Sequence, residues 1–322
     1  MIAALKFGVM VENHFGYDYQ TIHGIAQAAE RFGFDGLYMC DHLVNQNFAR
    51  LPCLDPYVAL GALASSTKKL RLGTLVTPVG FRYPSDVAKL AASLDTISNG
   101  RFQLGLGAGW NEPEYKAYGI PFPPVGQRTR QLREALQIVR LMWTEEKPSF
   151  KGRYFTITEA QCNPKPVQKP TKIWVGGKGE KAILKIVAEL ADGWNCLGTS
   201  LAEYEHLTGV LRGHCERAGR RMESIERSYY GWFLVGRSEK EFEELFEKHY
   251  APFKRADETM RQFKDRVLQG GRAFVGTIDQ AAERMRGFAK LGVSYLILYF
   301  PDRDLTGSMR LLSEKIMPVF RE

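Results

Sequence analysis

The chain has 322 residues, 44% of them hydrophobic and 25% charged, which is typical of a globular protein and excludes a disordered or fibrous one. Its net charge of +8 is spread along the sequence without a basic stripe interleaved with aromatic residues, which argues against nucleic-acid binding but suits an anionic small ligand. No apolar run comes near the roughly 20 residues of a membrane helix, and the sequence shows no signal-peptide layout, so we expect a cytoplasmic protein without membrane association. The 5 cysteines are scattered, so we expect neither disulfides nor structural zinc.

Short apolar segments alternate with amphipathic ones along the whole chain. Strands are expected at residues 5–11, 34–39, 70–77, 102–106, 173–175, 193–196, 228–235 and 295–299. Helices are expected between them at residues 19–32, 56–66, 85–97, 128–143, 180–190, 201–217, 239–250 and 278–291. Because the strands are continuously apolar, they predict a parallel sheet covered by helices. Eight such strands favour a (β/α)8 TIM barrel over an open doubly wound sheet.

Helix-start signals and two insertions complete the outline. Asp55 and Pro56 are typical of an N-cap and a first helical position, and Ser85 is the expected cap of the next helix. Residues 149–157 predict a small hairpin ahead of a proline-rich loop, and residues 251–271 a charged insertion. In a barrel such insertions often shape the mouth of the site. We expect residues 1–322 to form one domain.

The strand at residues 102–106 runs into a glycine-spaced turn and then an acidic segment that starts a helix. Gly107, Ala108 and Gly109 form this turn, and Glu112 follows in the helix start. Such a turn exposes backbone N–H groups at the carboxyl end of the strand, where they suit an anion such as a phosphate. The spacing alone is equally compatible with a tight strand-to-helix turn that binds nothing.

Five stretches together resemble the bacterial-luciferase-like family of flavin- and deazaflavin-dependent oxidoreductases. They are residues 34–42 (FDGLYMCDH), 72–78 (LGTLVTP), 98–112 (SNGRFQLGLGAGWNE), 164–177 (PKPVQKPTKIWVGG) and 191–195 (ADGWN). The resemblance implies a (β/α)8 barrel with its cofactor at the carboxyl ends of the strands. It also implies a homodimer, for which the apolar second and third helices would supply the surface.

Within that family, the segment from Gly107 to Tyr115, with Glu180 after Gly177-Lys178-Gly179, is most similar to members that use coenzyme F-420, a deazaflavin with a phosphate and a polyglutamate tail. Relatives with similar segments use FMN, so FMN is the alternative cofactor. One departure concerns the substrate. Some deazaflavin sugar-phosphate dehydrogenases carry a catalytic glutamate directly after the Gly-x-Gly, and Trp110 stands there in this chain.

The resemblance and the strand ends together assign the site residues. We expect His42, helped by Asp41, to handle a proton during hydride transfer, although a loop histidine and a loop cap are the alternatives. The Leu75-Val76 bond matches a non-proline cis peptide of relatives. The expected cofactor contacts are Leu75, Val76, Gly107, Ala108, Gly109, Trp110, Asn111, Gly176, Gly177 and Lys178. Asn13, His14 and Trp194 are candidates for the substrate side, with a solvated loop as the alternative for the first two and a core tryptophan for Trp194, and no residue spacing indicates a metal site.

Two functions of different classes remain open. The first is an oxidoreductase that transfers hydride between the deazaflavin and a small organic substrate, or an FMN-dependent monooxygenase on the same barrel. The second is a flavin-binding protein without turnover. A phosphosugar isomerase is a third hypothesis, but the sequence shows no convincing acid–base pair for it. His42 favours the enzyme, and the substrate is not readable from the sequence.

Overall fold

The computed structural model describes residues 4–44, 51–269, 273–302 and 307–321. Within these ranges eight parallel strands form a closed barrel, and the ladders of β9 with β10 and of β12 with β1 complete the ring. In ring order they are β1 (Lys6–Val11), β2 (Gly36–Met39), β3 (Arg71–Thr74), β5 (Phe102–Gly107), β8 (Ile173–Gly176), β9 (Gly193–Leu197), β10 (Glu226–Gly236) and β12 (Tyr295–Tyr299). The predicted (β/α)8 barrel is confirmed.

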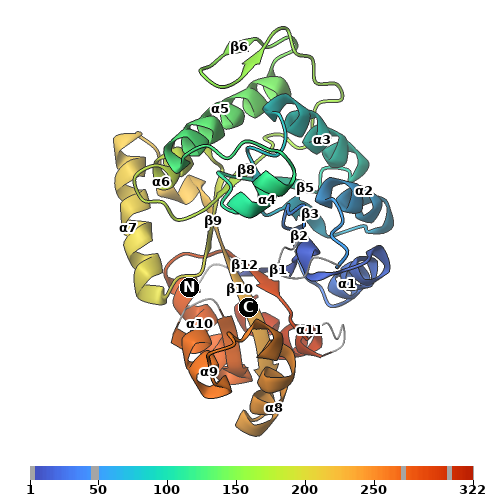
Figure 1. Cartoon of the computed structure of the whole chain (residues 1–322), viewed down its shortest axis with the longest axis vertical. Coiled ribbons are helices and arrows are strands. Elements are labelled where there is room, and N and C mark those ends of the chain that lie inside the picture. Colours follow the sequence, from blue (N-terminus) through green and yellow to red (C-terminus); the bar gives the residue numbers. More distant parts are fainter. Residues whose placement is uncertain (1–3, 45–50, 270–272, 303–306, 322) are drawn as a thin grey trace.

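Helices surround the strands (Figure 1). They are α1 (Tyr19–Arg31), α2 (Pro56–Ser66), α3 (Pro84–Ile97), α5 (Val125–Thr144), α6 (Ile183–Leu190), α7 (Leu201–Arg217), α8 (Glu239–Tyr250), α10 (Ile278–Lys290) and the short α11 (Ser308–Leu311). The Asp55 side chain caps α2, as predicted. The expected cap of α3 is wrong: Pro84 takes the first helical position, so Tyr83 is the N-cap and Ser85 lies inside the first turn.

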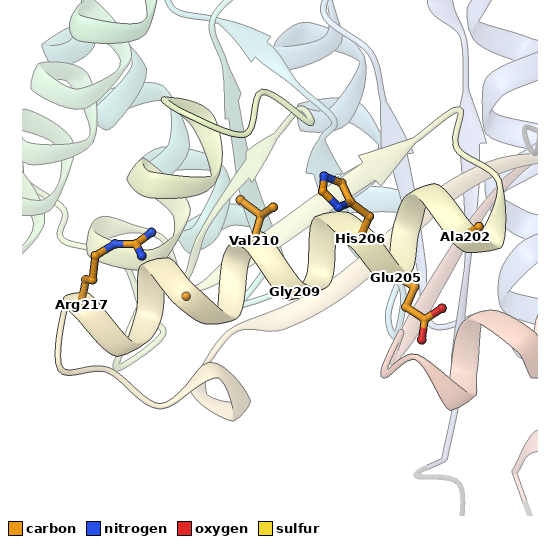
Figure 2. Close-up of a pocket in the computed structure, with 7 residues that line it drawn as sticks. Ala202, Glu205, His206, Gly209, Val210 and Arg217 are labelled. Atoms are coloured by element: carbon orange, nitrogen blue, oxygen red, sulfur yellow. The ribbon is translucent and has the colours of Figure 1, made fainter.

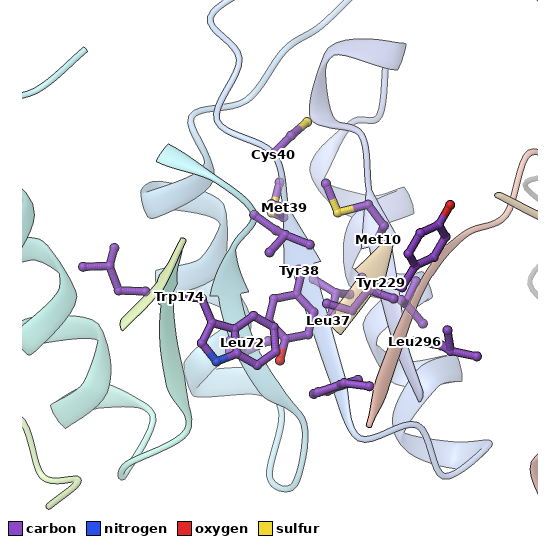
Figure 3. Packing of buried hydrophobic residues seen from close by; sticks show 14 of the residues in the cluster. Met10, Leu37, Tyr38, Met39, Cys40, Leu72, Trp174, Tyr229 and Leu296 are labelled. Atoms are coloured by element: carbon purple, nitrogen blue, oxygen red, sulfur yellow. The ribbon is translucent and has the colours of Figure 1, made fainter. Parts of the chain in front are cut away.

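Aromatic side chains fill the barrel axis (Figure 3). Tyr38 stacks on Trp174 with ring centroids 5.7 Å apart, and the edge of each ring meets Tyr295. All three side chains are fully buried. The barrel is therefore a packed core rather than a pore, and only its strand ends are available for a ligand.

The third predicted strand, residues 70–77, is wrong as one continuous element. It is divided into β3 and the short β4 (Thr77–Pro78), which pairs with β5. The peptide bond between Leu75 and Val76 is cis, as the family resemblance implies, and it lies in the gap between the two strands. Both halves pair with β5, but the register shifts by one residue between them, since Gly73 lies opposite Gln103 and Thr77 opposite Leu106.

Both insertions form structure of their own. The predicted hairpin pairs β6 (Phe150–Lys151) with β7 (Thr156–Ile157) in antiparallel register. The described part of the charged insertion holds a turn at Ala251–Phe253 and the helix α9 (Met260–Gln269). An additional strand, β11 (Ala273–Thr277), pairs with the end of β10.

A second, smaller hydrophobic cluster forms where β10 extends beyond the barrel. It comprises Leu234, Phe242, Phe246, Tyr250, Phe263 and Val275, from β10, α8, α9 and β11. β10 has 11 residues: its first part pairs with β9 and β12, and its last part pairs with β11. The insertion is thus attached to the barrel wall by a shared strand. No helix in the described part of the chain has the length and apolar character to cross a membrane.

Candidate functional site

The carboxyl ends of β1 and β2 bring two histidines together. His14 lies in the turn Asn13–Phe15 that follows β1, and His42 lies three residues beyond the end of β2. Their ring centroids are 4.4 Å apart. Each side chain retains partial exposure, 16% for His14 and 14% for His42, so solvent reaches both. His42 therefore occupies the end of the barrel at which the sequence places it.

A buried carboxylate from the helix that follows β5 holds His42 in place. Glu114, in α4 (Glu112–Ala117), has its Oε2 atom 2.9 Å from His42 Nδ1. Its Oε1 accepts hydrogen bonds from the backbone N–H groups of Leu43 and Val44. With only 1% of its side chain exposed, Glu114 joins α4 to the loop after β2. This leaves Nε2 as the imidazole nitrogen that is not engaged by the carboxylate.

The same contact sets the charge of the pair. Burial alone lowers the pKa of His42, but the hydrogen bond and the charge of Glu114 outweigh it, and the net pKa is raised. Burial raises the pKa of Glu114, yet the His42 and backbone donors outweigh it and lower the pKa. Burial lowers the pKa of His14 to about 4, which leaves that imidazole neutral at pH 7. Two adjacent imidazoles thus have pKa values moved apart by their surroundings.

Asp41 makes no hydrogen bond to His42 among the described residues, and its predicted help to His42 stays a prediction. Its carboxylate is bound by Arg82, which also bridges to Asp55 and lies over the Tyr57 ring at 4.8 Å. Burial raises the pKa of Asp41 to about 6, with the Arg82 charge opposing. Asp41 connects the loop after β2 to the segment before α3, and Glu114 takes the place expected for it beside His42.

The side chain of Val76 lies against the glycines of two neighbouring strands. A Cβ added to Gly107 would come within 2.5 Å of Val76 Cγ2, and one added to Gly176 within 2.9 Å of Val76 Cγ1. Glycine is therefore required at both positions by packing. The expected cofactor contacts Leu75, Val76, Gly107 and Gly176 converge on one place at the strand ends.

Two turns next to these glycines present unpaired backbone donors. Among the described residues, the N–H groups of residues 108–111 and 178–180 donate no hydrogen bond to the protein. The turns contain Gly109 with φ of 77° and Gly177 with φ of 130°, conformations that favour glycine. They follow β5 and β8, which pair with each other. Unpaired N–H groups on adjacent strand ends suit an anion.

Lys178 extends from the second turn but is engaged elsewhere. Its Nζ lies 2.8 Å from Glu203 Oε1 and 3.3 Å from the Gly198 carbonyl oxygen. Trp110 and Asn111 lie in the first turn, where Trp110 is 74% exposed and meets the His42 ring edge-on at 5.9 Å. The first turn therefore presents an indole, not a carboxylate, beside the histidine.

Two of the three candidates for the substrate side are interior residues, and for Trp194 the structure shows the alternative of a core tryptophan. Asn13 is fully buried and donates to the carbonyl oxygens of His42 and Leu54. Trp194 is fully buried, stacks on Tyr204, and donates from its indole N–H to the Gly177 carbonyl oxygen at 2.8 Å. Both side chains stabilise a turn through hydrogen bonds to its backbone carbonyl oxygens, since a polar atom on a buried side chain needs a hydrogen-bond partner. Of the three expected residues, only His14 reaches the open end.

Several residues of the site escaped the sequence reasoning. Glu114 is the main one: Glu112, two positions earlier, is exposed and pairs with Lys116 in the next turn. The available signal was the position of Glu114 directly before the buried Tyr115, on the apolar side of α4. Tyr230 of β10 also contributes, since its hydroxyl donates to Glu12 and accepts from the Trp232 indole N–H. No sequence pattern links residues 12 and 230.

A surface groove of about 700 Å³ lies along α7 (Figure 2), and His206 in its lining has its Nε2 atom 3.3 Å from Oε1 of Glu180 in the second turn. It is lined by Ala202, Glu205, His206, Gly209, Val210, Gly213 and Arg217, and α7 turns other side chains into the core. The groove carries none of the residues described above. We assign the site to the strand ends, where the turn donors and the histidine lie together.

A closed (β/α)8 barrel with a histidine–carboxylate pair and donor-rich turns at the carboxyl ends of its strands has the architecture of a barrel enzyme with an anionic ligand. The model of the luciferase-like monooxygenase family matches residues 5–295. The chain belongs to this family, and the resemblance predicted from its motifs is confirmed.

Individual relatives extend the comparison. An uncharacterized protein of Mycobacterium tuberculosis is 35% identical over 52% of this chain, and the match spans 64% of that protein's length. An F420-dependent glucose-6-phosphate dehydrogenase of Nakamurella multipartita is 27% identical over 92% of this chain and 91% of its own. Among solved structures, an F420-dependent secondary alcohol dehydrogenase bound to an F420–acetone adduct has a TM-score of 0.83, with 22% identity over 99% of this chain and all of its own.

The Glu114 contacts predict a loss of stability in Glu114→Gln. The amide keeps one acceptor oxygen but presents an NH2 group to His42, so a buried charge-assisted hydrogen bond is lost, and the free energy of unfolding should fall by about 1–3 kcal/mol. Glu112→Gln is the matched control, because the exposed pair with Lys116 contributes about 0.5 kcal/mol or less. Urea unfolding measures both, and equal midpoints for the two variants would contradict the assigned role of Glu114.

Proposed function

We propose that the protein is an oxidoreductase that transfers hydride between coenzyme F-420 and a small organic substrate. The observation that carries the proposal is the pair of donor-rich turns on the adjacent strands β5 and β8, at the same end of the barrel as His42. Family membership supports the reaction class. The F420-dependent relative matched along nearly its whole length supports the choice of cofactor.

The residues fit the cofactor's charged half. We assign its phosphate to the unpaired N–H groups of residues 108–111 and 178–180, in turns whose glycines leave no side chain in the way. Lys178 is a further candidate for the phosphate, in exchange for its ion pair with Glu203. The net charge of +8 suits a ligand that carries a phosphate and a polyglutamate tail.

We propose that His42 accepts or returns the substrate proton at Nε2. The bound cofactor supplies the hydride chemistry. The Glu114 carboxylate fixes the ring through Nδ1 and stabilises the imidazolium formed when Nε2 is protonated. His14, neutral and beside His42, adds no charge that would oppose this.

The substrate class stays open, with one constraint. The position after Gly109 holds Trp110, whose exposed indole faces His42. The indole is apolar, whereas some deazaflavin sugar-phosphate dehydrogenases carry a catalytic glutamate at this position. We therefore do not extend glucose-6-phosphate oxidation from the Nakamurella multipartita relative to this chain.

FMN is the second candidate cofactor, favoured by the monooxygenase members that give the family its description. Its single phosphate would use the same turns. A protein that binds either cofactor without turnover is the remaining alternative, and the buried His42–Glu114 pair argues against it because pairs with separated pKa values are typical of acid–base sites.

Cofactor titrations test the proposal. The purified protein should bind the deazaflavin, which absorbs at about 420 nm, more tightly than FMN, which absorbs at about 450 nm. Gly177→Asp should weaken deazaflavin binding at least tenfold, because it places a carboxylate in the turn assigned to the phosphate. Gly177→Ala, at the same φ of 130° but without the charge, controls for backbone strain. Equal affinity in the two variants would reject the assigned phosphate site.

The proposed role of His42 predicts separate effects on turnover and binding. In a panel of small alcohols and carbonyl compounds, His42→Ala should lower turnover roughly 10²–10⁴-fold, the usual range for loss of a general acid or base. Cofactor affinity should change little, since the turns hold the phosphate. His23→Ala, on the outer helix α1, is the control. A variant that loses affinity but keeps its turnover at saturating cofactor would make His42 a binding residue.

We also propose that the chain of residues 1–322, as one domain, forms a homodimer. Val58 on α2 and Ile97 on α3 are apolar side chains with 74% and 55% of their surface exposed, and the two helices contact each other. Light scattering should therefore report about twice the chain mass of 36.5 kDa at micromolar concentration. A mass of one chain at that concentration would reject the dimer.

A further inference from the structure

Three side chains with metal-binding atoms meet at the open end of the barrel. Cys40 follows β2 directly, His42 lies two residues later, and His14 comes from the turn after β1. One ligand atom from each lies within 4.8 Å of the others. The Cys40 Sγ atom is 3.4 Å from His14 Nδ1. The spacing of these residues in the sequence does not predict the cluster, because they follow two different strands.

The separation between Cys40 and His14 suits tetrahedral zinc. With Zn–S of about 2.3 Å and Zn–N of about 2.0–2.1 Å, sulfur and nitrogen ligands of one tetrahedron lie roughly 3.5 Å apart. The Cys40–His14 separation is close to this value. Glu12 Oε2 lies 3.5 Å from His14 Nδ1 but outside the group of mutually close ligand atoms, so the protein supplies three ligands and the fourth position is left for an exogenous one. A thiol with two imidazoles favours zinc over magnesium or calcium, which prefer oxygen ligands.

The surroundings already orient one ligand as zinc sites require. Glu114 engages His42 Nδ1, which leaves Nε2 for a metal, and a carboxylate on the second nitrogen is the usual partner of a metal-bound histidine. The Cys40 thiol donates to Asn13 Oδ1 at 2.9 Å. Zinc would replace that thiol proton, which leaves to solvent, and the hydrogen bond to Asn13 would be lost.

We propose that His14, Cys40 and His42 form a zinc-binding site that, when occupied, withdraws His42 from proton transfer. Metal binding itself is independent of the function proposed above, and only the effect on turnover rests on it. The site links the availability of a soft divalent cation to activity, because one imidazole nitrogen cannot serve both a metal and a substrate proton.

Cobalt is the spectroscopic probe for the metal site. Titration of the cofactor-free, full-length protein with Co²⁺ should give one saturable thiolate-to-cobalt charge-transfer band, which Zn²⁺ then displaces. In Cys40→Ser, whose hydroxyl still donates to Asn13, the band should vanish. Cys53→Ser is the matched control: its thiol donates to the His42 carbonyl oxygen at 3.2 Å but lies outside the cluster, so its band should be unchanged.

Two further measurements keep the outcome decisive. His14→Ala and Glu114→Gln should each weaken zinc affinity at least tenfold in competition with a chromophoric chelator, within the range known for ligand and outer-shell changes. No saturable band, or a band that persists in Cys40→Ser and vanishes in Cys53→Ser, would overturn the site. Zinc binding with undiminished turnover would overturn the inhibitory effect alone. Failure of cofactor binding would reject the proposed function and leave the metal result standing.

Discussion

The site depends on one buried carboxylate that joins two segments distant in the chain. Glu114 receives the His42 imidazole and two backbone N–H groups of the same loop, so a helix after β5 fixes the loop after β2. A buried carboxylate is tolerable only when donors surround it, and here the histidine and the loop supply them. The requirement is mutual, because the loop has no other partner for those two N–H groups within the described residues. Position and charge of His42 thus have a common origin.

Packing at the strand ends imposes a second constraint. Val76 occupies the space in which side chains at residues 107 and 176 would lie, so the two glycines are needed whether or not a ligand is bound. The same glycines leave the backbone of the adjoining turns open. A single apolar side chain therefore explains residues that a sequence comparison would attribute to a phosphate alone, and the two explanations are compatible.

Periodicity predicted most of the architecture. The eight barrel strands, the bounds of α2, α7 and α8, and the location of His42 at a strand end all follow from apolar segments of 3 to 8 residues separated by helical spacing. β11 was not predicted because it lies beside the end of β10 and outside the alternation of strands and helices.

The site was harder to predict. Its position is set by strand order, but the partners Glu114, Arg82 and Tyr230 are chosen by contacts between segments far apart in sequence, for which local patterns carry no signal. For the same reason the sequence does not decide whether Asn13 and Trp194 face the site or the interior, since nothing local distinguishes an inward from an outward side chain at a turn.

The shared strand β10 has a consequence for how such proteins diverge. Trp232, at the junction, contacts both Phe253 of the insertion and Tyr299 of the barrel, and its indole reaches Tyr230 and so Glu12. Substitutions in the insertion can therefore shift Trp232 and, through it, Tyr230 and Glu12. The glycine turns follow β5 and β8, which are other strands of the barrel. Such substitutions can alter the surroundings of Glu12 and Tyr230 without a direct contact to the two glycine turns, which leaves the two sides of this barrel end free to vary independently.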